Sequence, residues 1–275
     1  GVEAVMNPTL LNEVTGTVDR VRSAIAQASR RTGMDFGYLY KQASIESGLK
    51  PDAKARTSSA TGLYQFIDQS WLAALKRHGA KHGLQWAANS ISQTSGGRFY
   101  VNDAGTRAAI MGLRNEPEAS ALMAAETASE NREIIQRTTG RTATATDLYM
   151  GHFLGAQGAA DFLAAMAADP DRRAESVSPA AAASNRAVFY TPDGRPRTLS
   201  EVYARFASKM GDETPLPASE PVMMADASAE APPLPLGLAR ALDGSEGGVG
   251  LDDVLKQATP ENARLAYLML ASLGA

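Results

Sequence analysis

Residues 36–49 read FGYLYKQASIESGL, and residues 60–66 read ATGLYQF. In the first segment Leu39, Ala43 and Glu46 follow one another at steps of four and three residues, which places them on one face of a helix. The face begins with apolar side chains and ends in a carboxylate that points toward the core side. We therefore expect a helix that begins after Asp35 and carries Glu46 into a partly apolar environment.

Helical patterning continues on both sides of this segment. Apolar residues from Leu11 to Ile25 (Val14, Val18 and Val21 between them) recur at three- and four-residue steps, so a first amphipathic helix should end near Gly33. No extended stretch alternates with period two, so any sheet should be small. The expected fold class is mainly α, with further helices over residues 70–78, 106–113, 117–136, 147–153 and 157–166.

Residues with strong capping preferences mark the ends of these helices. Ser70 is expected to cap the start of its helix, and Gly79 to stop it. Pro117 suits a first helical position. Gly155 and Gly158 are expected to interrupt the last pair of helices.

Bulk composition limits the class of protein. At 275 residues and 44% hydrophobic, the chain can bury one substantial core and a second small element. A formal net charge of -3 and a pI near 5.7 argue against a dedicated nucleic-acid binder. The sequence has no cysteine, which excludes disulfides and cysteine-ligated metals, and no apolar run is long enough to predict a membrane span.

Charge divides the chain into two parts. Residues 211–275 hold ten acids and three bases, a net charge of -7, whereas residues 1–210 hold 24 bases and 20 acids, a net charge of +4. Six prolines fall between Pro215 and Pro235, among alanine, serine and acidic residues, and this composition is typical of a linker. The two parts are therefore expected to do different work.

A last helix is expected beyond the linker, where Pro260 and Glu261 stand at the first turn of a short apolar segment. The expected organisation is a helical domain over residues 1–210, an acidic Pro/Ala/Gly-rich linker over 211–259 and a C-terminal helix over 260–275. A lone apolar helix after a linker is expected to dock on a partner.

The chemistry of Glu46 follows from its predicted position. A carboxyl group in an apolar wall keeps its proton near neutral pH, because burial disfavours the charged form. Such a group can act as a general acid on a glycosidic oxygen. The alternative is a surface glutamate near a helix terminus, which is the ordinary role of an isolated glutamate.

Three motifs surround this glutamate. Glu46-Ser47 is followed by a loop with Lys50-Pro51-Asp52, then by Gly62-Leu63-Tyr64-Gln65 and later by Leu148-Tyr149-Met150-Gly151. The set resembles the soluble (SLT-like) lytic transglycosylases, which have a lysozyme-like α-helical fold and cleave bacterial peptidoglycan. The resemblance covers residues 30–80 closely and 140–165 more loosely. It departs from the family pattern at Tyr64, which replaces a methionine, and at Met150, which replaces an asparagine.

The resemblance implies roles for five residues. It makes Glu46 the catalytic acid, and it places Ser47, Tyr64, Gln65 and Tyr149 among the substrate-binding residues. An amide such as that of Gln65 offers a donor and an acceptor to an N-acetyl group, and a phenol such as that of Tyr149 can orient a carboxyl. The alternatives are a loop-anchoring amide for Gln65 and a half-buried packing aromatic for Tyr149.

The expected mechanism uses one carboxyl group. Ordinary glycosidases set two carboxyl groups about the scissile bond, yet Asp52, Asp68 and Asp147 do not stand where the resemblance would place a second catalytic group. In the resembled family the glutamic acid protonates the oxygen between N-acetylmuramic acid and N-acetylglucosamine, and then takes the proton of the muramyl C6 hydroxyl. That hydroxyl closes a 1,6-anhydro ring.

No cofactor or metal is expected for this chemistry. His78 and His82 stand four residues apart, but no acidic residue lies between them and glycines follow both. Two other interpretations stay open: a non-catalytic peptidoglycan-binding or assembly scaffold, and a hydrolysing lysozyme of related fold. A scaffold would not need the buried acid Glu46. A lysozyme would use the acid, but water would attack the sugar in place of the C6 hydroxyl.

Partners and compartment follow only from the resemblance and from composition. The expected substrate is the peptidoglycan glycan strand, with no nucleic acid and no membrane span. A flagellar or secretion machine is an expected partner for the C-terminal tail. The expected compartment is the periplasm of a Gram-negative cell, with a signal peptide absent or removed because Gly1-Val2-Glu3-Ala4 lacks its basic and apolar regions.

Overall fold

The computed structural model describes residues 8–211, with side chains from residue 13 onward. The expected linker beyond Gly211 and the expected helix over 260–275 lie outside the described residues. The described chain contains twelve α-helices and one two-stranded sheet, which confirms a mainly α fold with little sheet. It divides into two compact units, one ending at Ala125 and the other starting at Glu126. The expected single domain over 1–210 stays a prediction.

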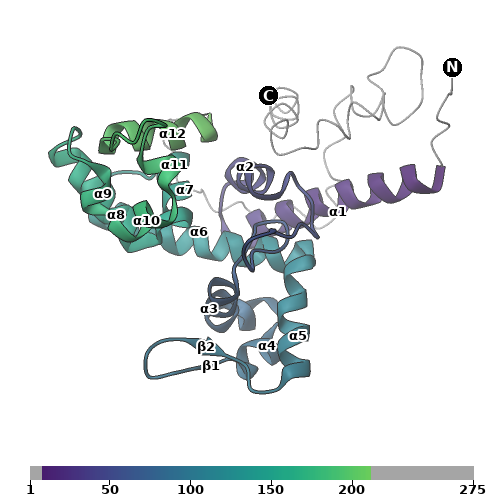
Figure 1. Cartoon of the computed structure of the whole chain (residues 1–275). Helices are drawn as coiled ribbons and strands as arrows, with labels where there is room; N and C mark the ends of the chain where they lie inside the picture. Colours follow the sequence, from purple (N-terminus) through teal and green to yellow (C-terminus); the bar gives the residue numbers. More distant parts are fainter. Residues whose placement is uncertain (1–7, 212–275) are drawn as a thin grey trace, which may run out of the picture. The chain divides into compact units, whose positions relative to one another are not determined.

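The first unit contains the predicted glutamate helix and its neighbours (Figure 1). Its elements are α1 (Pro8–Thr32), α2 (Phe36–Ser47), α3 (Asp68–His78), the 3-10 turn η1 (Gly79–His82), α4 (Gln85–Ser90), β1 (Ser92–Gln93), β2 (Phe99–Tyr100), α5 (Ala104–Gly112), η2 (Leu113–Asn115) and the start of α6 (Pro117–Thr139). α1 packs against α2, and α3 packs against α4 and β2.

α1 ends where the sequence predicts, because Gly33 adopts a positive φ of 75° and its N–H bonds the carbonyl oxygen of Ser29. The buried stripe on this helix is narrower than expected. Its buried members are Val21, Ala24, Ile25 and Ala28, whereas Val18 is 43% exposed. The apolar pattern therefore predicts the helix correctly but misplaces the start of the buried face.

The core of the first unit centres on Trp71 of α3. Its ring is fully buried, its indole Nε1 donates to the carbonyl oxygen of Ile110 at 2.9 Å, and it packs on Phe66 at a centroid distance of 5.0 Å. A buried indole with a satisfied N–H is stabilising, whereas an unsatisfied one would carry a desolvation cost. Trp71 and Phe66 thus both belong to the core of this unit.

The small sheet is an antiparallel hairpin that joins α3. Ser92 pairs with Tyr100 and Gln93 with Phe99. The Gln69 side chain donates to the carbonyl oxygen of Phe99 and accepts from its N–H, both at 2.9 Å. The Gln69 side chain therefore links the hairpin to the first turn of α3 through two hydrogen bonds with the backbone of Phe99.

The expected start of one helix in this unit is wrong, whereas its expected end, after His78, is right. α3 begins at Asp68 with Ile67 at its N-cap, so Ser70 lies inside the first turn. Gly79 adopts a right-handed conformation and the chain continues into η1, which ends at Gly83 with a φ of 78°. Gly83, in the left-handed region where a side chain would be strained, therefore ends η1, and Gly79 is the C-cap of α3.

The second unit is built around α7 (Ala145–Leu154), which packs against α8 (Ala156–Ala168) and α12 (Leu199–Met210). The remaining elements are the end of α6 and three short helices, α9 (Ala174–Val177), α10 (Pro179–Ser184) and α11 (Arg186–Phe189). Gly155 separates α7 from α8 as expected. Gly158 does not interrupt a helix, since it lies inside α8.

The helices from α9 to α12 have no counterpart in the sequence-based prediction. α12 carries a complete capping box, in which Thr198 accepts from the N–H of Glu201 and Glu201 accepts from the N–H of Thr198. Its buried face consists of Leu199, Val202, Phe206, Ala207 and Met210. This signal was present in the sequence and was missed.

Among the described residues, no helix is both long and apolar enough to cross a membrane.

Candidate functional site

The candidate site is built on α2, and both ends of this helix are fixed by local contacts. The Asp35 side chain accepts from the N–H of Tyr38 at 2.8 Å, which satisfies a donor that the helix start leaves open. Gly48 follows the last turn with a φ of 60°, and its N–H bonds the carbonyl oxygens of Ala43 and Ser44. Glu46 therefore lies in a last turn whose backbone is held in place, and its side chain is half-buried.

Two hydroxyl groups tie α2 to the segment 62–66. The Ser47 Oγ donates to the carbonyl oxygen of Leu63 at 2.7 Å, and the Tyr64 hydroxyl donates to the carbonyl oxygen of Leu39 at 2.8 Å. Both bonds are buried, which makes their loss costly. The Glu-Ser motif and the Gly-Leu-Tyr-Gln motif, separated in sequence, thus lie together in the first unit.

The segment 62–66 has an unusual backbone. Gly62 has a φ of 87° and Gln65 a φ of 53°, so this turn twice enters the left-handed region, once without glycine. The Gln65 Nε2 donates to the carbonyl oxygens of Gly62 and Ala53, at 2.9 and 3.1 Å. Thr61 forms bridges with Lys54 and Phe66 on the two sides of the turn. Strain of this kind is often found at binding or catalytic sites.

Arg114 holds the same turn from the other side and was not identified from the sequence. Its Nη1 donates to the carbonyl oxygens of Ser59 (2.7 Å) and Phe66 (3.1 Å) and to Asp68 Oδ1 (3.0 Å). The side chain is only 10% exposed, and this burial lowers the pKa of its guanidinium while the neighbouring Asp68 opposes the shift. The sequence carries no signal for it, because its partners lie about fifty residues away in the chain.

The structure gives Ser47 and Tyr64 structural roles. Ser47 is buried at 5% exposure and Tyr64 has no exposed surface, and both hydroxyl groups are engaged with backbone carbonyls. The substrate-binding role that the resemblance gives Tyr64 stays a prediction. Gln65 is half-buried and its amide nitrogen anchors the turn, which agrees with the alternative interpretation of a loop-anchoring amide.

Two further polar residues of α2 precede Glu46 at steps of four. Tyr38 and Gln42 are 2% and 3% exposed, and the Tyr38 hydroxyl and the Gln42 Oε1 have no hydrogen-bond partner in the protein. Burial, and secondarily the charge of Glu46, raises the pKa of Tyr38 well above its ordinary value of 10. The Tyr38 phenol is therefore within electrostatic reach of Glu46. The sequence analysis did not single out either residue.

Tyr149, the fifth expected site residue, lies on α7 in the second unit. It is 4% exposed, and its ring packs on Phe206 at 5.7 Å and on His152 at 5.9 Å. Its surroundings within this unit are those of a packed aromatic. The role that the resemblance gives it stays a prediction.

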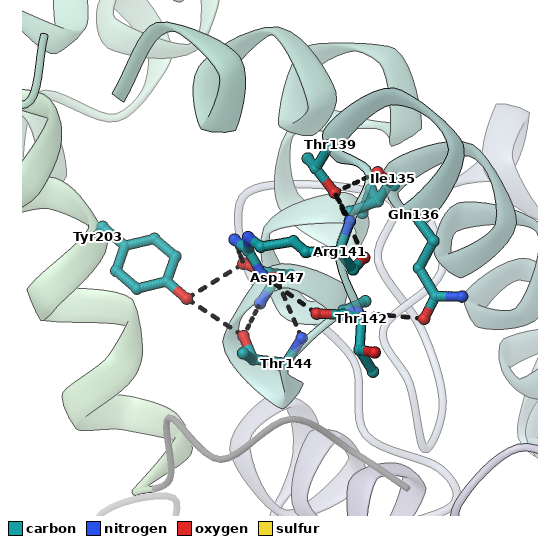
Figure 2. A network of polar contacts seen from close by, with 9 residues as sticks. Ile135, Gln136, Thr139, Arg141, Thr142, Thr144, Asp147 and Tyr203 are labelled. Carbon is teal, nitrogen blue, oxygen red and sulfur yellow. Dashed lines mark hydrogen bonds and ion pairs between the residues drawn. The ribbon is translucent and has the colours of Figure 1, made fainter. Parts of the chain in front are cut away.

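A buried polar network fixes the start of α7 near Tyr149 (Figure 2). Asp147 has no exposed side-chain surface and accepts from Arg141 Nη1 at 2.5 Å, from the Tyr203 hydroxyl at 3.1 Å and from the N–H of Thr144 at 2.9 Å. Thr144 in turn caps the helix through the N–H of Asp147. The carboxylate of Asp147 therefore has a structural role, because its oxygens are engaged by these donors.

The carboxylates that stand near the motifs differ in their surroundings. Asp147 is held as above, and Asp68 forms ion pairs with Arg114 at 3.0 Å and Arg107 at 3.2 Å. Asp52 is exposed in the loop after α2. Glu46 is the carboxylate of this group that combines partial burial with a position on a fixed helix end.

No group of three or more histidine, cysteine or acidic side chains in the described part of the chain is arranged to hold a metal ion. His78 is the last residue of α3, and its Nδ1 lies 3.5 Å from Lys81 Nζ. His82 lies in η1.

No protein-family model matches the chain.

Proposed function

We propose that the protein is a peptidoglycan lytic transglycosylase with a lysozyme-like catalytic fold, in which Glu46 is the only general acid and base. The observation that carries the proposal is the pair of buried bonds from Ser47 to Leu63 and from Tyr64 to Leu39. They unite the glutamate helix with the strained turn at Gln65, as a preorganised site requires.

The chemistry follows from the position of the acid. A half-buried carboxyl group at a fixed helix end can hold a proton and deliver it to the oxygen that links muramic acid to glucosamine. The resulting carboxylate then accepts the proton of the muramyl C6 hydroxyl, whose oxygen bonds C1 as the link to the leaving sugar breaks. The proton that Glu46 gave up is thus regained, and the product ends in a 1,6-anhydro ring.

The pairing of Asp68 and Asp147, the carboxylates close to the motifs in sequence, supports a single-acid scheme. Asp68 and Asp147 are paired with arginines, and a carboxylate committed to an arginine is a poor proton donor or nucleophile. The proposed substrate is therefore one that carries its own nucleophile. The periplasm of a Gram-negative cell is the compartment in which this substrate occurs.

The test is the product. The full chain is incubated with purified peptidoglycan, and the released fragments are analysed by mass spectrometry. We expect 1,6-anhydro ends from the wild type and none from Glu46→Gln, while Glu133→Gln, which removes an exposed carboxylate on α6, retains activity. Fragments with only reducing ends would assign a hydrolysing lysozyme instead. Activity in Glu46→Gln would reject Glu46 as the acid, and binding without cleavage by the wild type would assign a scaffold.

A further inference from the structure

Three side chains form a polar stripe along one side of α2. Tyr38, Gln42 and Glu46 are spaced by four residues within a continuous helix, so each is the neighbour of the next on the helix surface, at about 5–6 Å between Cβ atoms. The first two are buried, and each has one polar atom without a partner in the protein. A buried acceptor without a partner is destabilising in proteins, so the unpartnered oxygen of Gln42 needs an explanation.

The general direction of side chains on a helix predicts that the carboxyl of Glu46 points toward Gln42. Helical side chains lean toward the N-terminus and cover the turn before their own Cα. By this rule the carboxyl group is expected over the turn that holds Gln42, whose Oε1 is an acceptor and cannot donate. Only the protonated form of a carboxyl group can give that oxygen a hydrogen bond.

We propose that Gln42 is a positioning residue whose side-chain oxygen accepts a hydrogen bond from the protonated carboxyl of Glu46. This inference rests on the proposed function, since it takes Glu46 as the acid. The bond stabilises the neutral form, so the proton is retained until the glycosidic oxygen arrives. It also fixes the carboxyl rotamer, which orients the remaining oxygen toward the substrate.

Other ionisable groups around α2 come from three directions. From α1, Arg22 acts on Tyr40 and lowers the pKa that burial raises. From the turn at 62–66, Tyr64 is coupled to Tyr38, and on α2 itself Lys41 is buried. Burial raises the pKa of each of the three tyrosines above its ordinary value. These phenols are neutral wherever Glu46 titrates, so they do not reverse the sign of the effect assigned to Gln42.

The test measures the titration midpoint of Glu46 in the full chain. Glutamate is labelled with 13C at the carboxyl carbon, and the Glu46 resonance is assigned by its loss in Glu46→Gln. Gln42→Leu and Gln42→Met keep the buried volume but remove the amide oxygen. Both are expected to move the midpoint about one pH unit lower, because the neutral form loses its hydrogen bond.

Two variants control for general effects. Ser44→Ala removes a buried hydroxyl from the same helix, where it bonds the carbonyl oxygen of Tyr40 at 2.9 Å, and Gln157→Leu removes an exposed glutamine on α8. Both should leave the midpoint unchanged. A midpoint in the Gln42 variants equal to that of the controls overturns the inference. A shift to higher pH overturns it too, because the amide would then serve the charged carboxylate.

The pH dependence of kcat is the second measurement. The alkaline limb of kcat reports the loss of the acid's proton in the substrate complex, and it should move to lower pH in both Gln42 variants by the same amount as the NMR midpoint. If cleavage is absent or Glu46→Gln is active, the proposed function fails while the NMR titration still decides the pairing. If anhydro products form but neither limb nor midpoint moves, the pairing fails and the proposed function stands.

Discussion

Gly62 lies so close to Arg114 that a Cβ atom on the glycine would collide with the arginine's carbonyl oxygen. The glycine also has a φ of 87°, in the left-handed region. Two separate constraints, backbone conformation and close approach, therefore require glycine at this position of the Gly-Leu-Tyr-Gln motif. The glycine of this motif is therefore required by the packing of the turn at 62–66, which is part of the candidate site.

Gly62→Ala should lower the free energy of unfolding by more than a conformational penalty alone. A left-handed alanine costs about 1–2 kcal/mol, and the collision adds about 1–3 kcal/mol. Gly83→Ala is the matched control, because Gly83 has a φ of 78° but nothing within 4 Å of an added Cβ. Urea unfolding of both variants measures the difference. Equal losses would show that the close approach carries no cost.

Arg114→Met should destabilise the first unit strongly. The variant leaves the carbonyl oxygens of Ser59 and Phe66 without this donor and leaves Asp68 with Arg107 as its remaining ion pair. We expect a loss of about 3 kcal/mol, since buried polar groups lose their partner. Urea unfolding followed by the fluorescence of the buried Trp71 reports this unit.

Arg107→Met is the control for Arg114, because both arginines pair with Asp68. The Arg107 side chain is 46% exposed, compared with 10% for Arg114. An exposed ion pair contributes about 0–1 kcal/mol, so this variant should unfold close to the wild type. Similar losses in the two variants would mean that the carbonyl contacts of Arg114 contribute little.

In the first unit, the sequence best predicts the helix ends that are fixed by contacts between residues close together in the chain. α2 begins after Asp35 and α1 ends near Gly33 as expected, because a capping carboxylate and a left-handed glycine act on their immediate neighbours. Gly79 follows the last residue of α3 as expected, but it keeps a right-handed conformation, and Gly83 is the left-handed glycine that ends η1. The pattern alone does not say which of them takes the positive φ.

Long-range contacts account for what sequence reasoning missed at the site. Tyr64 was placed among the substrate-binding residues, and the sequence did not indicate that its hydroxyl bonds the carbonyl oxygen of Leu39, 25 residues earlier. Arg114 bonds partners that precede it by 46 to 55 residues. Gln42 was not singled out, because burial of its side-chain oxygen depends on tertiary packing. Spacing along one helix predicts a face, but not what covers it.

The stability of the second unit should fall in acid because of Glu201. Its hydrogen bonds to Arg195 lower the pKa of its carboxyl from the ordinary value of 4.5 to about 2. A lowered folded-state pKa contributes stability that is present above pH 4.5 and is lost as the pH falls toward 2. Hydrogen exchange at the start of α12 between these pH values measures the effect.

Arg195→Met should reduce the acid dependence at α12. The Arg195 guanidinium bonds both oxygens of Glu201, at 3.0 and 2.8 Å, and is the largest cause of the lowered pKa. Without it, amide protection in α12 should change less between pH 4.5 and 2. A wild-type and a variant with the same pH dependence would contradict this assignment. High salt should reproduce part of the variant's behaviour, since the pair is solvent-accessible.

Tyr203→Phe tests whether the Asp147 network joins α12 to α7. The Tyr203 hydroxyl bonds Asp147, whose side chain has no exposed surface, so its removal takes one of the donors from a buried carboxylate. We expect a loss of about 1.5–3 kcal/mol, the range for a hydrogen bond to a charged group. The matched control is Tyr190→Phe, which removes a phenol bonded to Glu175, a carboxylate with 28% side-chain exposure. Water can replace that partner, so the control should lose less.

Hydrogen exchange of α7 amides distinguishes the two variants. Faster exchange in Tyr203→Phe alone supports the network, whereas equal exchange in both variants argues that Arg141 and Thr144 hold Asp147 without Tyr203.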